Sequence, residues 1–295
     1  MAPSLPDQTG KVSLITGTTS GIGRATAQAL AQAGGTVLVS SRDLSKVEAA
    51  VDEIRRTAGN QDVHGVTLDL ASFASVRVAA ADVLQRWDRL DVLINNAGVY
   101  LSDRQVTADG FEMTFGTNHL GHFLLTTLLL DRLRDSGPSR VVNVSSAGHR
   151  FARRMTFDDL QSERRYSLND AYCRSKLANV LFTKELARRE TGAGVSAFAV
   201  HPGTIRSGFG QDGDTGGVMG AGLGVVRLIM TGPTRGAAAS LYAATAPGLE
   251  SRSGGYFQRR PGLGARSVHE ARPSAAARNE AAARQLWDVS ELLIT

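Results

Sequence analysis

Residues 16–23, Thr-Gly-Thr-Thr-Ser-Gly-Ile-Gly, decide the fold of this chain. They follow a short β-branched run and lead straight into a helical pattern. Glycines at such a strand-to-helix turn permit a tight bend, close packing of the helix on the strand, and close approach of a pyrophosphate to backbone N–H groups. The helix N-terminus adds a partial positive charge. The spacing is G-x-x-x-G-x-G, and we expect the phosphates to be held by Gly17, Thr19, Ser20, Gly21, Ile22 and Gly23.

Downstream of this turn, short strand-like runs alternate with longer helical stretches. Six strands are predicted at Val12–Thr16, Thr36–Ser41, Val63–Leu68, Asp91–Asn95, Arg140–Ser145 and Val195–Val200, and a short seventh at Gly255–Phe257. Helices are predicted near 22–33, 44–58, 73–87, 107–134 and 170–190. Crossovers of this length make the strands parallel. The sequence therefore predicts an α/β fold, a Rossmann-type doubly wound parallel sheet of about seven strands in the order 3-2-1-4-5-6-7, with helices on both faces.

Three further segments shape the expected organisation. An alanine-rich stretch, 275–293, should be a terminal helix that docks through Leu286, Val289 and Leu293, with Trp287 at the margin of that face. Glycines crowd 203–234, which suits a mobile substrate lid, although a disordered surface loop is the alternative. Apolar residues at 223–230 suggest a mainly apolar pocket wall, or equally a helix core. We find no linker or repeat, so residues 1–295 are expected to form a single dinucleotide-binding domain.

Composition excludes several classes of protein. The chain carries 33 Lys and Arg against 28 Asp and Glu, but the arginines are scattered among acids, so no nucleic-acid partner is expected. The lone cysteine, Cys173, excludes an intrachain disulfide and fits a reducing cytoplasm. No apolar segment approaches the ~20 residues that span a bilayer. The first ten residues have no apolar core of signal-peptide type. We therefore expect a cytoplasmic protein with no membrane partner.

The end of the second predicted strand, Ser40-Ser41-Arg42-Asp43, bears on cofactor choice. Enzymes that use the unphosphorylated cofactor place an acid here, whereas Arg42 would hold a 2′-phosphate by charge-assisted hydrogen bonds. This favours NADP(H) over NAD(H). In the rival interpretation, Asp43 binds the ribose and Arg42 only faces solvent. Further along, Asp69 and Leu70 are expected at the adenine edge, and Asn96, Ala97 and Gly98 on the path to the nicotinamide, where asparagine amides tie strand ends together.

Tyr172 and Lys176 open a long helical run and lie one turn apart on the same face. If both point into a cleft, the ammonium would stabilise the phenolate and bring a pKa of about 10 towards neutrality. Such a pair is common on any amphipathic helix. The chemical interpretation therefore depends on a cofactor site built by the same chain.

Taken in order, these residues resemble the short-chain dehydrogenase/reductase family in its dehydrogenase-type pattern. The matching segments are Thr16-Gly17-x-x-x-Gly21-Ile22-Gly23, Asn95-Asn96-Ala97-Gly98, Asn118, Ser146, Tyr172-x-x-x-Lys176 and Pro202-Gly203. Residues 117–123, TNHLGHF, and 172–179, YCRSKLAN, are similar to the retinol dehydrogenase and WW-domain oxidoreductase branch, as is the Leu286-Trp287 ending. Vertebrate retinol dehydrogenases usually carry an N-terminal membrane anchor, and none is found here, so retinol itself is not implied.

The resemblance implies a role for each matching residue. Tyr172 would be the general acid in reduction or base in oxidation, and Lys176 would lower its pKa and bind the nicotinamide ribose. Ser146 would hydrogen-bond the substrate oxygen, and its place three after Asn143 favours it over Ser145. Asn118 would hold a water that relays protons. The resemblance also assigns cofactor contacts to Tyr172, Lys176, Pro202, Gly203, Ile205 and Ser207.

The resemblance leaves several structural expectations. The 25 residues between Ser146 and Tyr172 are about twice the usual interval, so 150–167 should form a flap beside the active site. A homodimer or homotetramer through the helices at 107–134 and 170–190 is implied. His119 and His122 invite a metal interpretation, but without a third ligand we expect helix packing and no metal.

The expected function is hydride exchange between NADP(H) and a carbonyl or alcohol, with a lipophilic, polyketide-like or steroid-like substrate. One alternative is a regulator that senses NADP(H) without turnover, although such proteins usually lose the tyrosine or lysine. Another is an NAD(P)-dependent epimerase or dehydratase of the extended type, which is disfavoured because its first turn is normally G-x-x-G-x-x-G.

Overall fold

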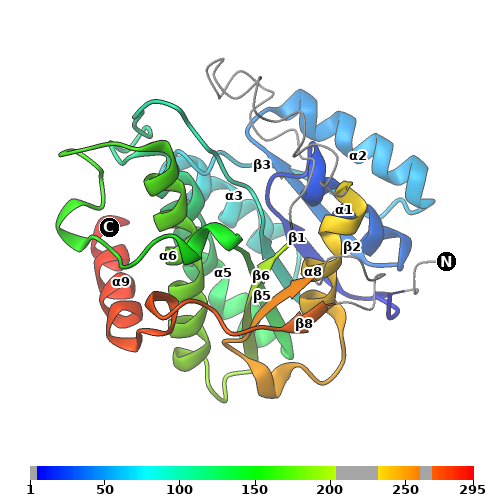
Figure 1. Cartoon of the computed structure of the whole chain (residues 1–295). Helices are drawn as coiled ribbons and strands as arrows, with labels where there is room; N and C mark the ends of the chain where they lie inside the picture. Colours follow the sequence, from blue (N-terminus) through cyan, green and yellow to red (C-terminus); the bar gives the residue numbers. More distant parts are fainter. Residues whose placement is uncertain (1–4, 204–231, 260–267) are drawn as a thin grey trace.

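One sheet runs through the middle of the protein, with helices on both faces (Figure 1). The computed structural model describes residues 5–203, 232–259 and 268–295. Within these residues the sheet has eight strands in the order β3-β2-β1-β4-β5-β6-β7-β8. The strands are β1 (Val12–Ile15), β2 (Thr36–Ser41), β3 (Val63–Thr67), β4 (Val92–Asn95), β5 (Ser139–Val144), β6 (Val195–His201), β7 (Tyr256–Arg259) and β8 (Val268–Glu270).

The predicted strand order is confirmed, and an eighth strand extends it. All neighbours from β3 to β7 pair in parallel, whereas β8 pairs with β7 antiparallel, Phe257 opposite Glu270. Strand β8 has only three residues and one apolar side chain, Val268. The expected count of about seven strands is therefore one short, because this edge strand has no apolar run to mark it.

Helices connect the strands and cover the two faces. They are α1 (Gly21–Gln32), α2 (Leu44–Ala58), α3 (Phe73–Arg86), α4 (Met113–Phe115), α5 (Gly121–Asp135), α6 (Leu168–Arg189), α8 (Pro233–Thr245) and α9 (Glu280–Leu293), with a π-helical turn η1 (Gly116–Leu120) and short 3₁₀ turns η2 (Ala147–Arg150), η3 (Phe157–Asp159), η4 (Glu250–Arg252) and η6 (Ala276–Arg278).

The helix predicted over 107–134 begins later than expected. Val106 instead forms an antiparallel bridge with Glu112. The two carboxylate oxygens of Glu112 accept hydrogen bonds from Thr114 N at 2.8 Å and Phe115 N at 2.7 Å. These bonds satisfy N–H groups that a helix start leaves open, so the helical segment begins at Met113.

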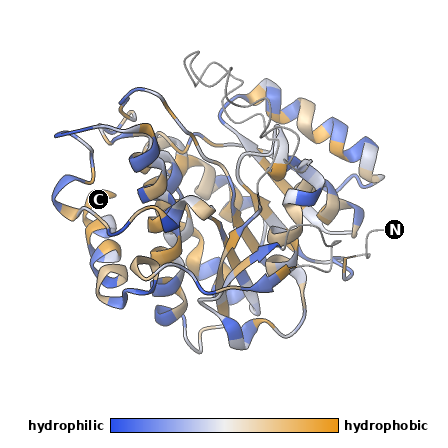
Figure 2. Ribbon diagram, viewed as in Figure 1, coloured by the Kyte–Doolittle hydropathy of each residue, from blue (hydrophilic) through white to orange (hydrophobic). Residues whose placement is uncertain are grey.

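Two hydrophobic cores lie on the two faces of the sheet, because consecutive strand residues point to opposite sides. In β1, Leu14 packs into the core shared with α3, α5 and α6, whereas Ile15 packs into the core shared with α1, α2 and α8. The central strands are accordingly mostly hydrophobic (Figure 2). This packing holds the carboxyl ends of the strands in place, where the site lies.

Helix α9 packs on α6 at the outer edge of the molecule (Figure 1). Leu286 is buried as expected, but the prediction that Trp287 lies at the margin is wrong. Its ring is buried against Phe123 of α5, with centroids 4.9 Å apart, and lies 5.8 Å from Phe182 of α6. Helix α9 sits in the corner between two helices, so adjacent positions both contact the core, while Val289 and Leu293 are only half-buried.

The docking of α9 bears on the expected oligomer. It covers the parts of α5 and α6 around Phe123 and Phe182, which belong to the helices expected to meet a second subunit. The homodimer or homotetramer stays a prediction. None of the helices in the described ranges combines the length and the apolar content that crossing a bilayer requires. The cytoplasmic location likewise stays a prediction.

Candidate active site

The glycine turn between β1 and α1 is so tightly built that positions 17 and 23 have no room for a side chain. Gly17 adopts a φ of 69°, and a Cβ there would lie 2.9 Å from the Ala97 Cβ. A Cβ on Gly23 would lie 2.2 Å from the Gly17 carbonyl oxygen and 2.5 Å from Asn96 Nδ2. Both glycines are thus required by close approach of backbone and of neighbouring strand ends. The tight turn and the close packing of helix on strand that the sequence predicted are present.

Asparagines at the end of β4 lock this turn to the neighbouring strands. Asn96 Nδ2 donates to Thr16 O at 2.8 Å and Gly17 O at 3.2 Å. Thr16 Oγ1 in turn accepts from Asn96 N at 2.9 Å and Ala97 N at 3.0 Å. Asn95 Nδ2 donates to Asn143 Oδ1 of β5 at 2.8 Å. The expectation that amides tie the strand ends together is confirmed.

The N-terminus of α1 has open hydrogen-bond donors. Its N-cap, Ser20, makes no side-chain capping bond, and the first turn contains no acidic residue. The first N–H groups of a helix have no intrahelical partner and carry partial positive charge. The residues present therefore fit a pyrophosphate.

At the end of β2 the two candidates for ribose recognition differ in their local engagement. Asp43 caps α2: its Oδ1 accepts from Ser45 Oγ at 2.7 Å and from Lys46 N at 3.2 Å. These hydrogen bonds, led by that from Ser45, lower the pKa of Asp43. Arg42 is exposed at the strand end. After β3, Asp69 Oδ1 accepts from Ala71 N at 2.9 Å, and Leu70 is buried against Gly121.

Tyr172, Ser146, Lys176 and Asn118 converge beside the end of β5. A Cβ built on Gly148 would lie 3.4 Å from Tyr172 Cε1 and 3.5 Å from Ser146 Oγ, so both side chains border the same glycine. Lys176 Nζ lies 5.6 Å from the centre of the Tyr172 ring and donates to Val144 O at 3.1 Å. A Cβ built on Gly98 would lie 3.1 Å from Asn118 Oδ1 and 3.5 Å from Lys176 Nζ. The structure thus brings together the four residues that the sequence singled out.

Ser175 joins Asn118 to the tyrosine and was missed by sequence reasoning. Asn118 Oδ1 accepts from Val99 N at 2.7 Å, and its Nδ2 donates to Val99 O and Ser175 Oγ, each at 3.0 Å. Ser175 Oγ donates to Tyr172 O at 2.8 Å. The only sequence signal was a small polar residue directly before Lys176 in the segment YCRSKLAN.

The pKa values of Tyr172 and Lys176 differ from the expectation. Burial is the leading cause that raises the pKa of Tyr172, to about 12, while the nearby Ser146 hydroxyl lowers it. Burial also lowers the pKa of Lys176 to about 8. The prediction that Lys176 brings the tyrosine towards neutrality is therefore wrong for this arrangement, because desolvation dominates and the amine faces Val144 O. At neutral pH the phenol keeps its proton.

The two histidines of η1 and α5 bind different partners. His119 Nε2 lies 2.9 Å from Ser290 Oγ of α9, and His122 Nε2 lies 2.8 Å from Thr16 Oγ1. Burial is the leading cause that lowers the pKa of each to about 3. The rings therefore fill the interior as neutral hydrogen-bonding groups.

The two segments expected to border the substrate are described to different extents. Residues 204–231 of the predicted lid, with Ile205 and Ser207, lie outside the described residues, whereas Pro202 and Gly203 directly follow β6. In the 150–167 segment, Gln161 Oε1 accepts from Glu112 N at 2.7 Å, and Arg174 Nη1 donates to Asp159 O at 3.0 Å. This segment is thus anchored to α6, which carries Tyr172, and to the residue that caps α4.

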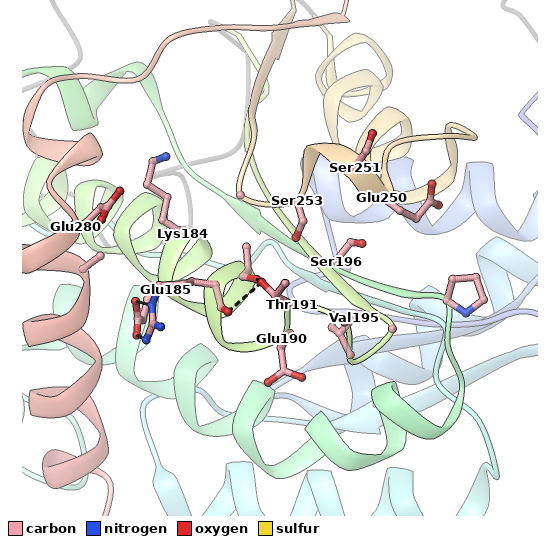
Figure 3. A pocket seen from close by; sticks show the side chains of 17 residues that line it. Lys184, Glu185, Glu190, Thr191, Val195, Ser196, Glu250, Ser251, Ser253 and Glu280 are labelled. Carbon is pink, nitrogen blue, oxygen red and sulfur yellow. Dashed lines mark hydrogen bonds and ion pairs between the residues drawn. The ribbon is translucent and has the colours of Figure 1, made fainter.

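A groove of about 600 Å³ lies elsewhere, at the amino-terminal ends of β5 and β6 beside Pro138 and Val195 (Figure 3). Its carboxylates are engaged in ion pairs: Glu185 with Arg188 at 2.6 Å, Glu190 with Arg134 at 2.7 Å, and Glu250 with Arg140 at 2.6 Å. Ligands of parallel α/β sheets bind at the carboxyl ends of the strands. We therefore place the candidate site at the glycine turn and Tyr172.

Comparisons with known proteins identify the family of this chain. The short chain dehydrogenase family matches residues 11–216. Mouse Retinol dehydrogenase 11 is 47% identical over 281 residues, covering 95% of this chain and 85% of the relative. Human Retinol dehydrogenase 13 is 44% identical over 296 residues, covering 99% and 87%.

Solved structures show the same fold. A crystal structure of an uncharacterized protein from Mycobacterium paratuberculosis superposes with a TM-score of 0.77 at 38% identity, covering 98% of this chain and 95% of that one. The Pseudomonas aeruginosa RhlG/NADP active-site complex superposes with a TM-score of 0.68 at 26% identity, covering 89% and 99%.

Proposed function

The chain belongs to the short-chain dehydrogenase family, in its retinol dehydrogenase branch, and is an NAD(P)-dependent oxidoreductase of alcohols or carbonyls; we propose that it uses NADP(H) on a lipophilic ketone or aldehyde. The observation that carries the proposal is the convergence of Ser146, Tyr172 and Lys176 near the carboxyl end of β5. Ser146 Oγ and the Tyr172 ring both border Gly148, and Lys176 Nζ lies 5.6 Å from the centre of that ring. This convergence supports a site in which a proton donor and a second hydroxyl would hold a substrate oxygen.

The proposed chemistry follows from the protonation state of each group. A bound nicotinamide would supply or accept a hydride at its C4 atom. Ser146 and the neutral Tyr172 would both hydrogen-bond the substrate oxygen, and charge that develops on that oxygen would be stabilised there. Because the pKa of Tyr172 is about 12, the phenol holds a proton at neutral pH and is ready to donate it to an alkoxide. The resting phenol thus has the protonation state in which it would act as the acid in carbonyl reduction.

Lys176 and Asn118 would support that proton transfer. With a pKa of about 8, Lys176 is mostly protonated at neutral pH, so it would bind ribose hydroxyls and help to restore the proton of Tyr172. Asn118 lies within reach of Lys176, since both border Gly98. Its side chain is held on both sides by Val99, so we assign it to orienting a proton relay and not to direct proton exchange.

The preference for NADP(H) rests on the contrast at the end of β2. The Asp43 carboxylate already accepts two hydrogen bonds as the cap of α2, whereas Arg42 is exposed and suited to a 2′-phosphate. The Arg42→Ala variant should raise the KM for NADPH by about tenfold or more and change the KM for NADH little. Initial rates with both cofactors measure this, and equal effects on the two would remove the phosphate role.

The substrate class rests on the relatives and on the segments around the site. The two relatives are named for retinol, a long apolar alcohol, and cover nearly the whole chain. We propose that 150–167 forms the flap of an apolar substrate pocket within a single domain; most of the predicted lid, 204–231, lies outside the described residues. A panel of apolar and polar carbonyls, followed by NADPH consumption and product analysis, tests this. Stoichiometric turnover of apolar carbonyls is expected, and turnover of sugars or of no carbonyl at all would contradict it.

A further inference from the structure

We propose that His122 is a positioning residue that couples the cofactor turn to the proton-transfer site. The inference rests on the proposed function, because it concerns the same site. His122 lies in the first turn of α5, fully enclosed, four residues after Asn118. Its Nε2 is 2.8 Å from Thr16 Oγ1 and its Nδ1 is 3.2 Å from Asn118 O. One ring therefore touches the residue that opens the glycine turn and a member of the Tyr172 site.

The hydrogen bonds around Thr16 fix which nitrogen of His122 carries the proton. Thr16 Oγ1 accepts from the N–H groups of Asn96 and Ala97, so its lone pairs are occupied and its own proton must point elsewhere. The two acceptors in reach are His122 Nε2 at 2.8 Å and Ile94 O at 3.4 Å, and the shorter contact is the stronger bond. Nε2 is then an acceptor, and the proton sits on Nδ1, where it is donated to Asn118 O.

Burial keeps the His122 ring in one protonation state. Desolvation is the leading cause that lowers the pKa of His122 to about 3, so the ring is neutral across the physiological range. A neutral imidazole has one donor and one acceptor, and here each has a single partner. The order of donation runs from the Ala97 N–H to Thr16, from Thr16 to His122, and from His122 to Asn118.

The far end of this chain of bonds reaches Tyr172. Asn118 lies in the π-helical turn η1, where Gly121 N bonds to Gly116 O instead of to the carbonyl four residues back. The main chain of η1 thus lacks the ordinary helix register, and the Nδ1–H of His122 holds the Asn118 carbonyl in place. The Asn118 amide binds Ser175, which binds the Tyr172 carbonyl. Loss of the ring should therefore loosen both the glycine turn and the backbone of the proton donor.

Two substitutions separate the two hydrogen bonds of the His122 ring, the one with Thr16 and the one with Asn118. In His122→Asn the short amide reaches about as far as Nδ1, so it retains a donor for Asn118 O but loses the acceptor for Thr16. In His122→Gln the amide oxygen reaches about as far as Nε2, so Thr16 keeps its acceptor while the donor to Asn118 is lost. Loss of one such hydrogen bond corresponds to roughly a tenfold change in a binding or rate constant. We expect His122→Asn to raise the Kd of NADPH about tenfold with kcat little changed, and His122→Gln to lower kcat about tenfold with Kd little changed.

Three controls make the result decisive. His119→Gln removes an equally buried histidine that binds Ser290 of α9, so it should lower stability but change neither Kd nor kcat. Thr16→Val removes the hydroxyl from the other end, and a double variant with His122→Asn should bind NADPH no more weakly than Thr16→Val alone. The Kd is measured by binding and the melting temperature by calorimetry, so neither depends on turnover.

The outcomes distinguish this inference from the proposed function. A higher Kd and a lower kcat together in both His122 variants, in proportion to the fall in melting temperature, would show a packing role and overturn the coupling. Additive effects in the Thr16 and His122 double variant would do the same. Wild-type protein that binds NADPH but reduces no carbonyl would instead count against the proposed function. The predicted rise of Kd in His122→Asn would even then support the link between His122 and the glycine turn.

Discussion

Replacing Lys176 by methionine should make the protein more stable at pH 7 although it removes a residue of the active site. Burial lowers the pKa of Lys176 to about 8 from its ordinary 10.5. Between those values the unfolded chain binds more protons than the folded one, so stability rises with pH in this window. The charged amine thus costs about 3 kcal/mol at pH 7, and most of that cost is gone by pH 10. Methionine is neutral, of similar length, and carries no such cost.

The hydrogen bonding of Lys176 does not reverse this expectation. Its amine donates to Val144 O at 3.1 Å, but Asn179 Nδ2 donates to the same oxygen, also at 3.1 Å. The substitution therefore leaves no buried carbonyl without a donor. Measured by urea unfolding, the advantage of Lys176→Met over wild type should shrink by about 2–3 kcal/mol between pH 7 and pH 10.

A lysine outside the core provides the control. Lys184 lies on the same helix and is partly exposed, so Lys184→Met should show no comparable pH-dependent difference from wild type. If Lys176→Met were less stable than wild type by the same amount at both pH values, the amine would not be desolvated as described. The reasoning on its pKa would then be refuted.

Two further predictions concern the turn and the buried histidines. Gly23→Ala places a Cβ 2.2 Å from the Gly17 carbonyl oxygen. The variant should therefore lower the free energy of unfolding by about 1–3 kcal/mol and weaken NADPH binding. Urea unfolding measures the first effect and titration of the cofactor the second. Binding as tight as in wild type would mean that the turn is not the phosphate site. Since burial lowers the pKa of His119 to about 3 from 6.5, the unfolded state binds more protons below pH 6.5 and stability falls as pH drops. His119→Gln should lose about 2–3 kcal/mol less than wild type between pH 7 and pH 4.5, and an identical acid profile would contradict the buried neutral ring.

Local patterns predicted most of the framework because they reflect burial along each element. The strand starting at Val195 and the helix spanning Leu44–Ala58 fall where apolar periodicity placed them. Strand β8 lacks such a pattern, and its pairing depends on the neighbouring edge of β7. Trp287 is buried because α9 meets two helices at once, which the pattern of one helix does not reveal.

The candidate site likewise has features that local sequence patterns predict and features that depend on the folded protein. The four-residue spacing was enough to put Tyr172 and Lys176 on one face, and the motif order brought Ser146 and Asn118 to them. The direction of the Tyr172 pKa was missed because spacing does not report how deeply the phenol is buried. The link from Thr16 to His122 joins residues 106 positions apart, so it depends on how β1 and α5 meet in the folded protein.

The central claim is that Tyr172 is the proton donor of an NADP(H)-dependent reaction, and Tyr172→Phe tests it most directly. The substitution keeps the ring, which contacts Tyr100 with centroids 5.0 Å apart, and removes only the hydroxyl. We predict that NADPH binds with nearly the wild-type Kd while carbonyl reduction falls by on the order of 10² to 10⁴. Wild-type turnover in the Tyr172→Phe variant would contradict the claim.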